Sequence, residues 1–198
     1  MTKKQRDKRS ELLARQFIDS ILNANTAANV ELMETPRRLS DLYHDMTEGL
    51  KIDITRFFRP LPTSHDQMIV VSDIEFVSMC EHHWWPFFGK AHIAYIPDGK
   101  IIGLSKFHSA VRALARRPQL QERMTAELCS AIQNALHPKG TMVVIEARHT
   151  CMMVGGRYDY GMPAHTDSIT RTSDVRGVFL LFEAPRNEAL KLMFGGKK

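Results

Sequence analysis

The first fifty residues carry hydrophobic side chains at helical spacing. Between Ser10 and Leu50, apolar positions recur every three or four residues, which places them on one face of a helix. The apolar positions of the first helix are Leu12, Leu13, Phe17, Ile18, Ile21 and Leu22. A second helix is predicted from Thr35, which can cap it, with Pro36 in its first turn. Prolines then interrupt the pattern, so residues 1–66 are predicted to form an N-terminal helical arm and a connection.

The rest of the chain, residues 67–198, alternates between strand and helix patterns. Strands are predicted at 68–80, in a hairpin at 90–105, at 141–153 and at 177–183. Helices are predicted from Ser105, as the cap, to about Arg116 and, after Pro118, to about Leu136. The order β-β-α-α-β-β predicts an α+β fold in which an antiparallel sheet carries paired helices on one face.

Composition adds limits on location and partners. The chain has 198 residues, three cysteines and a net charge of +5, from 27 basic and 22 acidic residues. The charged N-terminus lacks the apolar segment of a secretory signal, and no apolar run reaches the length of a membrane span. We therefore expect a cytoplasmic protein with free thiols. An anionic small molecule explains the mild positive excess as well as nucleic acid does, and the chain lacks the aromatic-basic interleaving of a strand-binding surface, so neither nucleic acid nor a membrane is expected as partner.

Two short segments carry side chains that bind metals well. Cys80 and His83 have C-x-x-H spacing, with His82 between them, and His149 and Cys151 close a later strand. Residues two apart on a strand point to the same face, so the two segments could converge if they are neighbours in the sheet. Thiolates together with imidazoles favour zinc in a reducing compartment.

Two kinds of zinc site fit this spacing. With four protein ligands the site would be closed and structural, whereas with three a water would complete the shell and be activated as a nucleophile. Three histidines and two cysteines compete for at most four places, which favours the second kind and leaves a histidine free to transfer protons. The third cysteine, Cys129, lies in a helical pattern without a histidine neighbour and is assigned to the core.

Three long motifs carry a family resemblance. They read CEHHWWPFFGKAHIAYIPDGKIIGLSK, ARRPQLQERMTAEL and VVIEARHTCMM, and with the residues around them they resemble GTP cyclohydrolase I from about Thr35 to Met153. The resemblance implies the tunnelling fold (T-fold), in which subunits join their sheets into a barrel, with residues 67–198 as the catalytic domain. It also implies a homodecamer with active sites at subunit interfaces, which hydrolyses GTP to 7,8-dihydroneopterin triphosphate and formate.

The same resemblance implies roles for the metal-binding segments. Cys80, His83 and Cys151 would hold Zn²⁺, with water in the fourth position to attack C8 of the guanine ring. His149 would protonate the adjacent ring nitrogen. His82 would act on the ribose as the sugar ring opens and rearranges. The aromatic residues after His83 would wall the site and pack against a neighbouring subunit.

Substrate contacts are implied at two further places. Glu122, with Gln121 beside it, would hold the guanine edge, because a carboxylate can accept two N–H bonds at once. Ser105 and Lys106 would receive phosphate at a helix N-terminus, where exposed N–H groups and the helix dipole favour an anion.

The chain departs from the family at two phosphate-binding positions. Where the family usually has arginine, this sequence has Ser109 and Gly155, and the stretch 155–177 is longer than usual and differs in composition. Nearby arginines that could compensate are Arg112, Arg157, Arg171 and Arg176. The alternatives are therefore a rebuilt triphosphate site or a cyclohydrolase-like paralogue that acts on a guanine nucleotide, nucleoside or base with fewer phosphates. A purine- or pterin-binding ring without activity is a third, which the intact His82 and His149 argue against.

Overall fold

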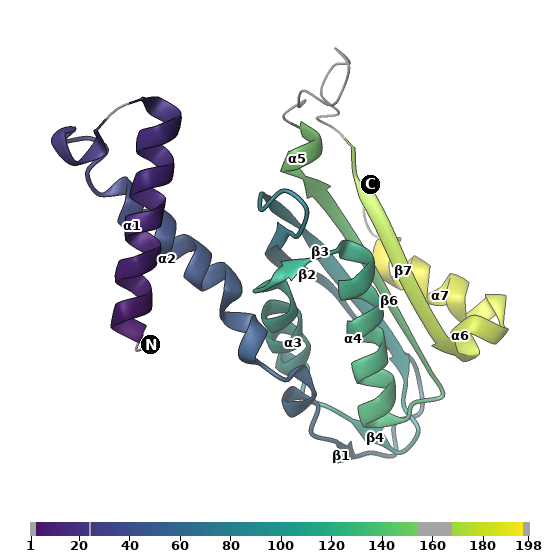
Figure 1. The fold of residues 1–198 in the computed structure, drawn as a ribbon. Helices are drawn as coiled ribbons and strands as arrows, with labels where there is room; N and C mark the ends of the chain where they lie inside the picture. Colours follow the sequence, from purple (N-terminus) through teal and green to yellow (C-terminus); the bar gives the residue numbers. More distant parts are fainter. Residues whose placement is uncertain (1–2, 24, 154–167, 196–198) are drawn as a thin grey trace. The chain divides into compact units, whose positions relative to one another are not determined.

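The structure, a computed structural model, describes residues 3–23, 25–153 and 168–195 and divides into two compact units, Met1–Glu48 and Gly49–Lys198 (Figure 1). Among the residues described, no helix combines the length and the apolar character that crossing a membrane requires. Short 3₁₀ helices lie at Thr26–Ala28, Glu48–Lys51 and Ile54–Phe57.

The first unit is a helical pair, as the apolar spacing predicts. Its helices are α1 (Lys3–Leu22) and α2 (Thr35–Thr47). Ser10 on α1 bonds to Ser40 Oγ at 2.7 Å and to His44 Nε2 at 2.8 Å on α2. Pro36 does lie in the first turn of α2, but the capping residue is Glu34 rather than Thr35. The following apolar side chains of α1 are more than half exposed within this chain: Leu12, Leu13, Phe17, Ile21 and Leu22.

The second unit is built on a five-stranded sheet with the order β5-β2-β3-β6-β7. Its strands are β2 (Ile69–Cys80), β3 (Pro86–Ile96), β5 (Pro118–Gln119), β6 (Gly140–His149) and β7 (Thr170–Gly177). All neighbouring pairs are antiparallel except β2 with β5, which is parallel. A separate two-stranded sheet joins β1 (Leu61–Pro62) to β4 (Lys100–Ile101). The predicted α+β class with an antiparallel core is confirmed.

The predicted hairpin at 90–105 is wrong in its pairing. β3 is bonded to β2 along one edge and to β6 along the other, so neither edge is free for β4. The chain turns at Gly99, whose φ of +74° suits glycine, and β4 instead pairs with β1.

Two other predicted strands are partly helical. Residues 150–153 form the short helix α5 (Thr150–Met153), and the run predicted as a strand at 177–183 forms α6 (Val178–Leu181). Gly177 ends β7 with a φ of +59°, and the Phe182 N–H then donates to the Val178 carbonyl at 2.9 Å, a helical bond. Helix α7 (Glu183–Phe194) follows.

Helices cover both faces of the sheet, not one as the sequence pattern predicts. The paired helices α3 (Ser105–Ala115) and α4 (Gln121–Leu136) cover the first face, whereas α6 and α7 lie on the second (Figure 1). Alternate residues of the central strands point to opposite faces, as the period of a strand requires. Ile93, Val143 and Ile145 join the α3–α4 core, while Ala94, Met142 and Val144 pack with Phe179, Ala189 and Met193.

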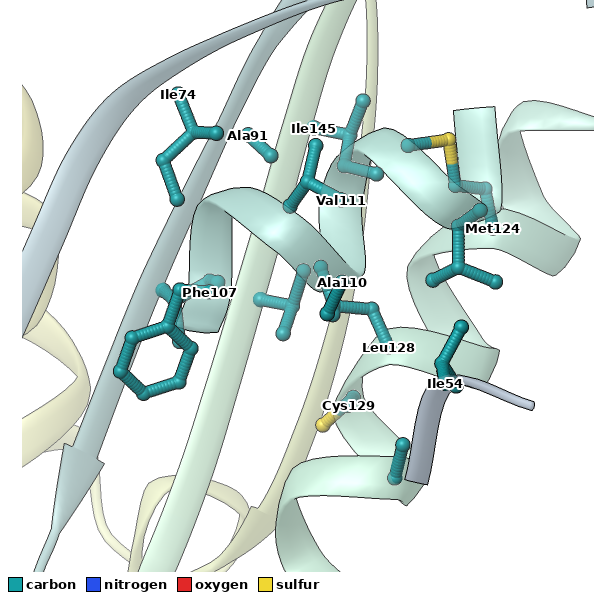
Figure 2. Close-up of a cluster of buried hydrophobic side chains, with 14 of the residues drawn as sticks. Ile54, Ile74, Ala91, Phe107, Ala110, Val111, Met124, Leu128, Cys129 and Ile145 are labelled. Atoms are coloured by element: carbon teal, nitrogen blue, oxygen red, sulfur yellow. The ribbon is translucent and has the colours of Figure 1, made fainter. Parts of the chain in front are cut away.

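The α3–α4 core includes part of the predicted connection. Ile54 and Phe58 are buried with Phe107 of α3 and Leu128 of α4 (Figure 2 shows Ile54, Phe107 and Leu128). The connecting segment therefore packs with the body. The functional division at residue 66, with a catalytic domain beyond it, stays a prediction.

Cys129 lies in this core, as predicted, and its thiol is expected to be unreactive. Its Sγ lies 3.9 Å from the Thr141 carbonyl oxygen and 3.6 Å from that of Asp174, and burial raises its pKa to about 12. Because the thiolate is the nucleophile, iodoacetamide at mildly alkaline pH should leave Cys129 unmodified in the folded protein and modify it after denaturation. Site-resolved mass spectrometry checks this. Rapid alkylation of the folded chain at Cys129 would contradict it.

Candidate active site

The hairpin loop between β2 and β3 presents the histidine pair. The Cys80 N–H donates to the Trp85 carbonyl and the Trp84 N–H to the Cys80 carbonyl, both at 2.8 Å, and Trp84 has a φ of +57°. This closed loop leaves His82 and His83 exposed, with their ring centroids 6.2 Å apart.

The second metal-binding segment meets the first at this end of the sheet. The ligand atoms of Cys80, His149 and Cys151 all lie within 4.8 Å of one another. The Nδ1 atom of His83 is outside this mutual group but lies 3.8 Å from Cys80 Sγ. Of the four side chains expected to converge, three therefore meet and His83 lies near Cys80 alone, although β2 and β6 are not neighbours: β3 lies between them, and Phe87 pairs with His149.

The donor atoms of this cluster suit a bound cation. Burial raises the pKa of the Cys151 thiol, and the neighbouring Cys80 raises it further. Burial also lowers the pKa of His149, while the charge of Glu122 acts in the opposite direction. Two thiolates this close repel each other unless a cation lies between them. Sulfur and imidazole nitrogen donors are the set that zinc prefers, so the residues present fit that metal.

His149 is held from two sides. Its ring stacks on the fully buried Phe87, with centroids 4.5 Å apart and planes 4° from parallel. Its Nε2 lies 2.9 Å from the amide oxygen of Gln121.

The two tryptophans of the hairpin loop are largely exposed. Trp84 and Trp85 are 51% and 42% exposed, so within one chain they are not core residues.

The two residues predicted at the guanine edge point in different directions. Glu122 is exposed in the first turn of α4, near enough to His149 to affect its pKa. Gln121 is only 2% exposed, and its amide nitrogen donates to the carbonyls of Ile145 and Thr170, each at 3.0 Å.

An arginine on α4 bonds to the hairpin loop that carries His82 and His83, called here the histidine loop. Arg123 forms an ion pair with Glu81, donates from Nε to Gln119 Oε1 at 3.1 Å and from Nη2 to the Pro118 carbonyl at 3.0 Å. The Glu81 N–H in turn donates to the Gln119 carbonyl at 3.0 Å. Sequence reasoning does not find Arg123, because its ion-pair partner lies 42 residues away and the segment reads as an ordinary polar helix start.

The predicted phosphate residues lie far from the cluster in this chain. Ser105 and Lys106 are exposed in the first turn of α3, next to Phe107, whose ring packs against Tyr95 with centroids 5.7 Å apart. Tyr95 is eight residues along β3 from Phe87, which is roughly 26 Å at the rise of a strand. The structure therefore does not bring Ser105 and Lys106 together with the cluster.

The altered phosphate positions are only partly described. Ser109 donates to the carbonyl of Ser105 at 3.3 Å, and Arg112 is exposed on the same helix. Arg171 donates to Glu146 at 3.2 Å, and Arg176 donates to Asp174 at 3.0 Å and to Ser130 at 3.1 Å. Gly155, Arg157 and most of the inserted stretch lie outside the described residues.

Similarity to known proteins covers nearly the whole chain. The family model for GTP cyclohydrolase I matches residues 14–193. A protein named GTP cyclohydrolase 1 from Streptococcus pyogenes is 42% identical over 188 residues, which cover 93% of this chain and 92% of the relative. Proteins of the same name from Geobacillus kaustophilus and Chlorobium phaeovibrioides are 47% and 46% identical over 164 residues, 82% of this chain and 84% and 71% of theirs.

Among solved structures, the apo form of an archaeosine synthase QueF-Like aligns with 56% of this chain and 93% of its own, with a TM-score of 0.44 and 14% identity. That likeness is too low to add to the argument. The family match and the sequence relatives are decisive, and by both the chain belongs to the GTP cyclohydrolase I family of hydrolases.

Proposed function

We propose that this protein is a zinc-dependent GTP cyclohydrolase I, which opens the imidazole ring of GTP at C8 and yields 7,8-dihydroneopterin triphosphate and formate. The observation that carries the proposal is the convergence of Cys80, His149 and Cys151 within 4.8 Å, beside the exposed His82 and His83. Relatives named for this activity, 42% and 47% identical to the chain, support it.

Cys80, Cys151 and His83 would hold the zinc ion. Bound there, zinc would supply a Lewis acid that lowers the pKa of water and makes it a nucleophile near neutral pH. The protein would supply proton transfer: His149 to the ring nitrogen beside C8, and His82 to the ribose as the sugar opens and rearranges. Glu122, exposed near His149, would accept the N–H groups of the guanine edge.

A second copy of the chain would complete the site. Ser105 and Lys106, the proposed phosphate contacts, lie next to Phe107, whose ring packs against Tyr95, and Tyr95 is roughly 26 Å along β3 from Phe87 at the cluster end. Trp84 and Trp85 are exposed beside the cluster and offer apolar surface to a neighbour. Both features support an assembly of the T-fold type, a homodecamer whose sheets join into a barrel with active sites at subunit interfaces.

Turnover by zinc-loaded protein tests the function. GTP, GMP, guanosine and guanine would be offered side by side, with a chelator-treated control, while formate and pterin fluorescence are followed. We expect chelator-sensitive turnover of GTP well above the others, which requires that arginines such as Arg112 compensate for Ser109 and Gly155. Turnover of a less phosphorylated compound with GTP inert would overturn the proposed substrate, and no turnover of any of them would overturn the activity.

A further inference from the structure

We propose that Gln121 is a positioning residue for His149: it accepts the Nε2–H bond of the ring and so fixes Nδ1 as the nitrogen that serves the site. What Nδ1 then does rests on the proposed function. The assignment of the ring hydrogen to Nε2 rests on hydrogen-bond chemistry. It also gives Gln121 a role different from the contact with guanine that the family resemblance implies.

The orientation of the Gln121 amide follows from its partners. One end of the amide faces the carbonyl oxygens of Ile145 and Thr170, each at 3.0 Å. Carbonyl oxygens only accept hydrogen bonds, so that end must be the NH₂ group. The other end, the oxygen, is therefore the atom 2.9 Å from His149 Nε2. An amide oxygen only accepts as well, so the hydrogen between the two atoms belongs to Nε2.

Two threonines extend the same network. The Thr125 hydroxyl donates to the backbone carbonyl of Gln121 at 2.8 Å, and it lies 2.7 Å from the Thr172 hydroxyl. Because Thr125 has used its single hydrogen, Thr172 must donate to Thr125. The lone pairs of Thr172 then face the Gln121 amide nitrogen at 3.2 Å, as a third acceptor that shares one of the two amide hydrogens with a carbonyl. Every donor in this chain of bonds has an acceptor, so a flipped Gln121 amide would break several of them.

The surroundings make this arrangement rigid. Gln121 is 2% exposed and bonds to β6 and β7 from the first turn of α4, while Phe87 stacks on the face of the His149 ring. A ring held at its face and at Nε2 has one nitrogen left for substrate or metal, which is Nδ1. Partners of this kind, which act through a histidine at a metal site, typically contribute 10- to 100-fold in metal affinity or activity.

Three variants test the proposal. Gln121→Met keeps the length of the side chain and removes both the acceptor and the donors. Gln121→Glu keeps an acceptor oxygen for Nε2–H. Gln133→Met is the matched control, since Gln133 lies on the same helix and bonds to Thr141 at 2.9 Å and to the Pro138 carbonyl at 3.3 Å, with no contact to the site. Thermal unfolding and light scattering establish that the variants fold and assemble like the parent.

The readouts are steady-state kinetics and solid-state ¹⁵N NMR of zinc-loaded protein labelled at histidine, with the His149 signal assigned by its loss in His149→Asn. In the parent we expect the hydrogen on Nε2. In Gln121→Met we expect that preference to be lost and kcat for GTP to fall roughly 10- to 100-fold with KM little changed. Gln121→Glu should keep the hydrogen on Nε2, although its second oxygen meets the carbonyls of Ile145 and Thr170 and need not restore kcat in full, and Gln133→Met should match the parent.

Each contrary result leads to a different conclusion about Gln121. A parent spectrum with the hydrogen on Nδ1 overturns the proposal directly, whatever the kinetics. A raised KM with unchanged kcat in Gln121→Met would assign Gln121 to substrate contact instead. Equal loss in Gln121→Met and Gln121→Glu, with the ring unchanged, would assign it a purely structural role. Absence of GTP turnover in the parent would overturn the proposed function, while the spectra would still decide which nitrogen Gln121 holds.

Discussion

Cys80→Ser and Cys151→Ser should each release the zinc ion and reduce turnover to background. The Sγ atoms of both residues lie in the 4.8 Å group, and a serine hydroxyl does not ionise near neutral pH as a zinc-bound thiol does. The loss should exceed the roughly 100-fold that removal of an outer-shell partner costs, because a ligand itself is gone. Metal analysis of the purified protein, with turnover measured on the same samples, checks both expectations.

The matched control is Cys129→Ala, which removes the one remaining thiol. Cys129 is buried between α4 and the sheet and lies outside the cluster, so zinc content and turnover should stay near the parent values once folding is confirmed. Full zinc content in either serine variant would rule out that cysteine as a ligand. Loss of zinc in Cys129→Ala without unfolding would move the metal site elsewhere.

The sequence is sufficient to predict the elements that carry Cys80 and His149. The β-branched run ending at Cys80 and the apolar run ending at His149 are strands in the structure, and their ends meet. The prediction succeeded because the local spacing of apolar residues indicates where each strand ends and therefore which residues lie at that end. The predicted reason was incomplete, since β3 separates the two strands, and Cys151 reaches the cluster from a short helix rather than from a strand.

Features set by long-range packing were not predictable in this way. The apolar run after Gly177 has strand composition, yet Phe179 packs in a helix against the second face of the sheet, where the tertiary contact overrides local propensity. Gln121 and Glu122 are adjacent in sequence, but helical geometry buries one and exposes the other. Arg123 and Glu81 form their ion pair only because β5 brings the start of α4 beside the histidine loop.

His82→Ala and His149→Ala should both remove turnover and keep the metal, because each histidine is proposed to transfer a proton. General acid–base catalysis contributes roughly 10²- to 10⁴-fold, and losses of that size in kcat are expected for each variant. His82 is exposed on the hairpin loop and outside the 4.8 Å group, so its removal leaves the cluster intact. His65→Ala, at another exposed histidine of the second unit, should change neither zinc content nor kcat.

The two kinds of zinc site give His149 different roles: a metal ligand in the closed site and a proton-transferring residue in the three-ligand site. Its ligand atom lies in the mutual group with Cys80 and Cys151, while His83 lies 3.8 Å from Cys80 alone, so geometry permits it as a fourth ligand. Zinc retained in His149→Ala with turnover lost fits the three-ligand site and a proton-transferring His149. Zinc lost from His149→Ala would instead support a closed site of two cysteines and two histidines, in which the nitrogen left by Gln121 binds metal and proton transfer falls to His82.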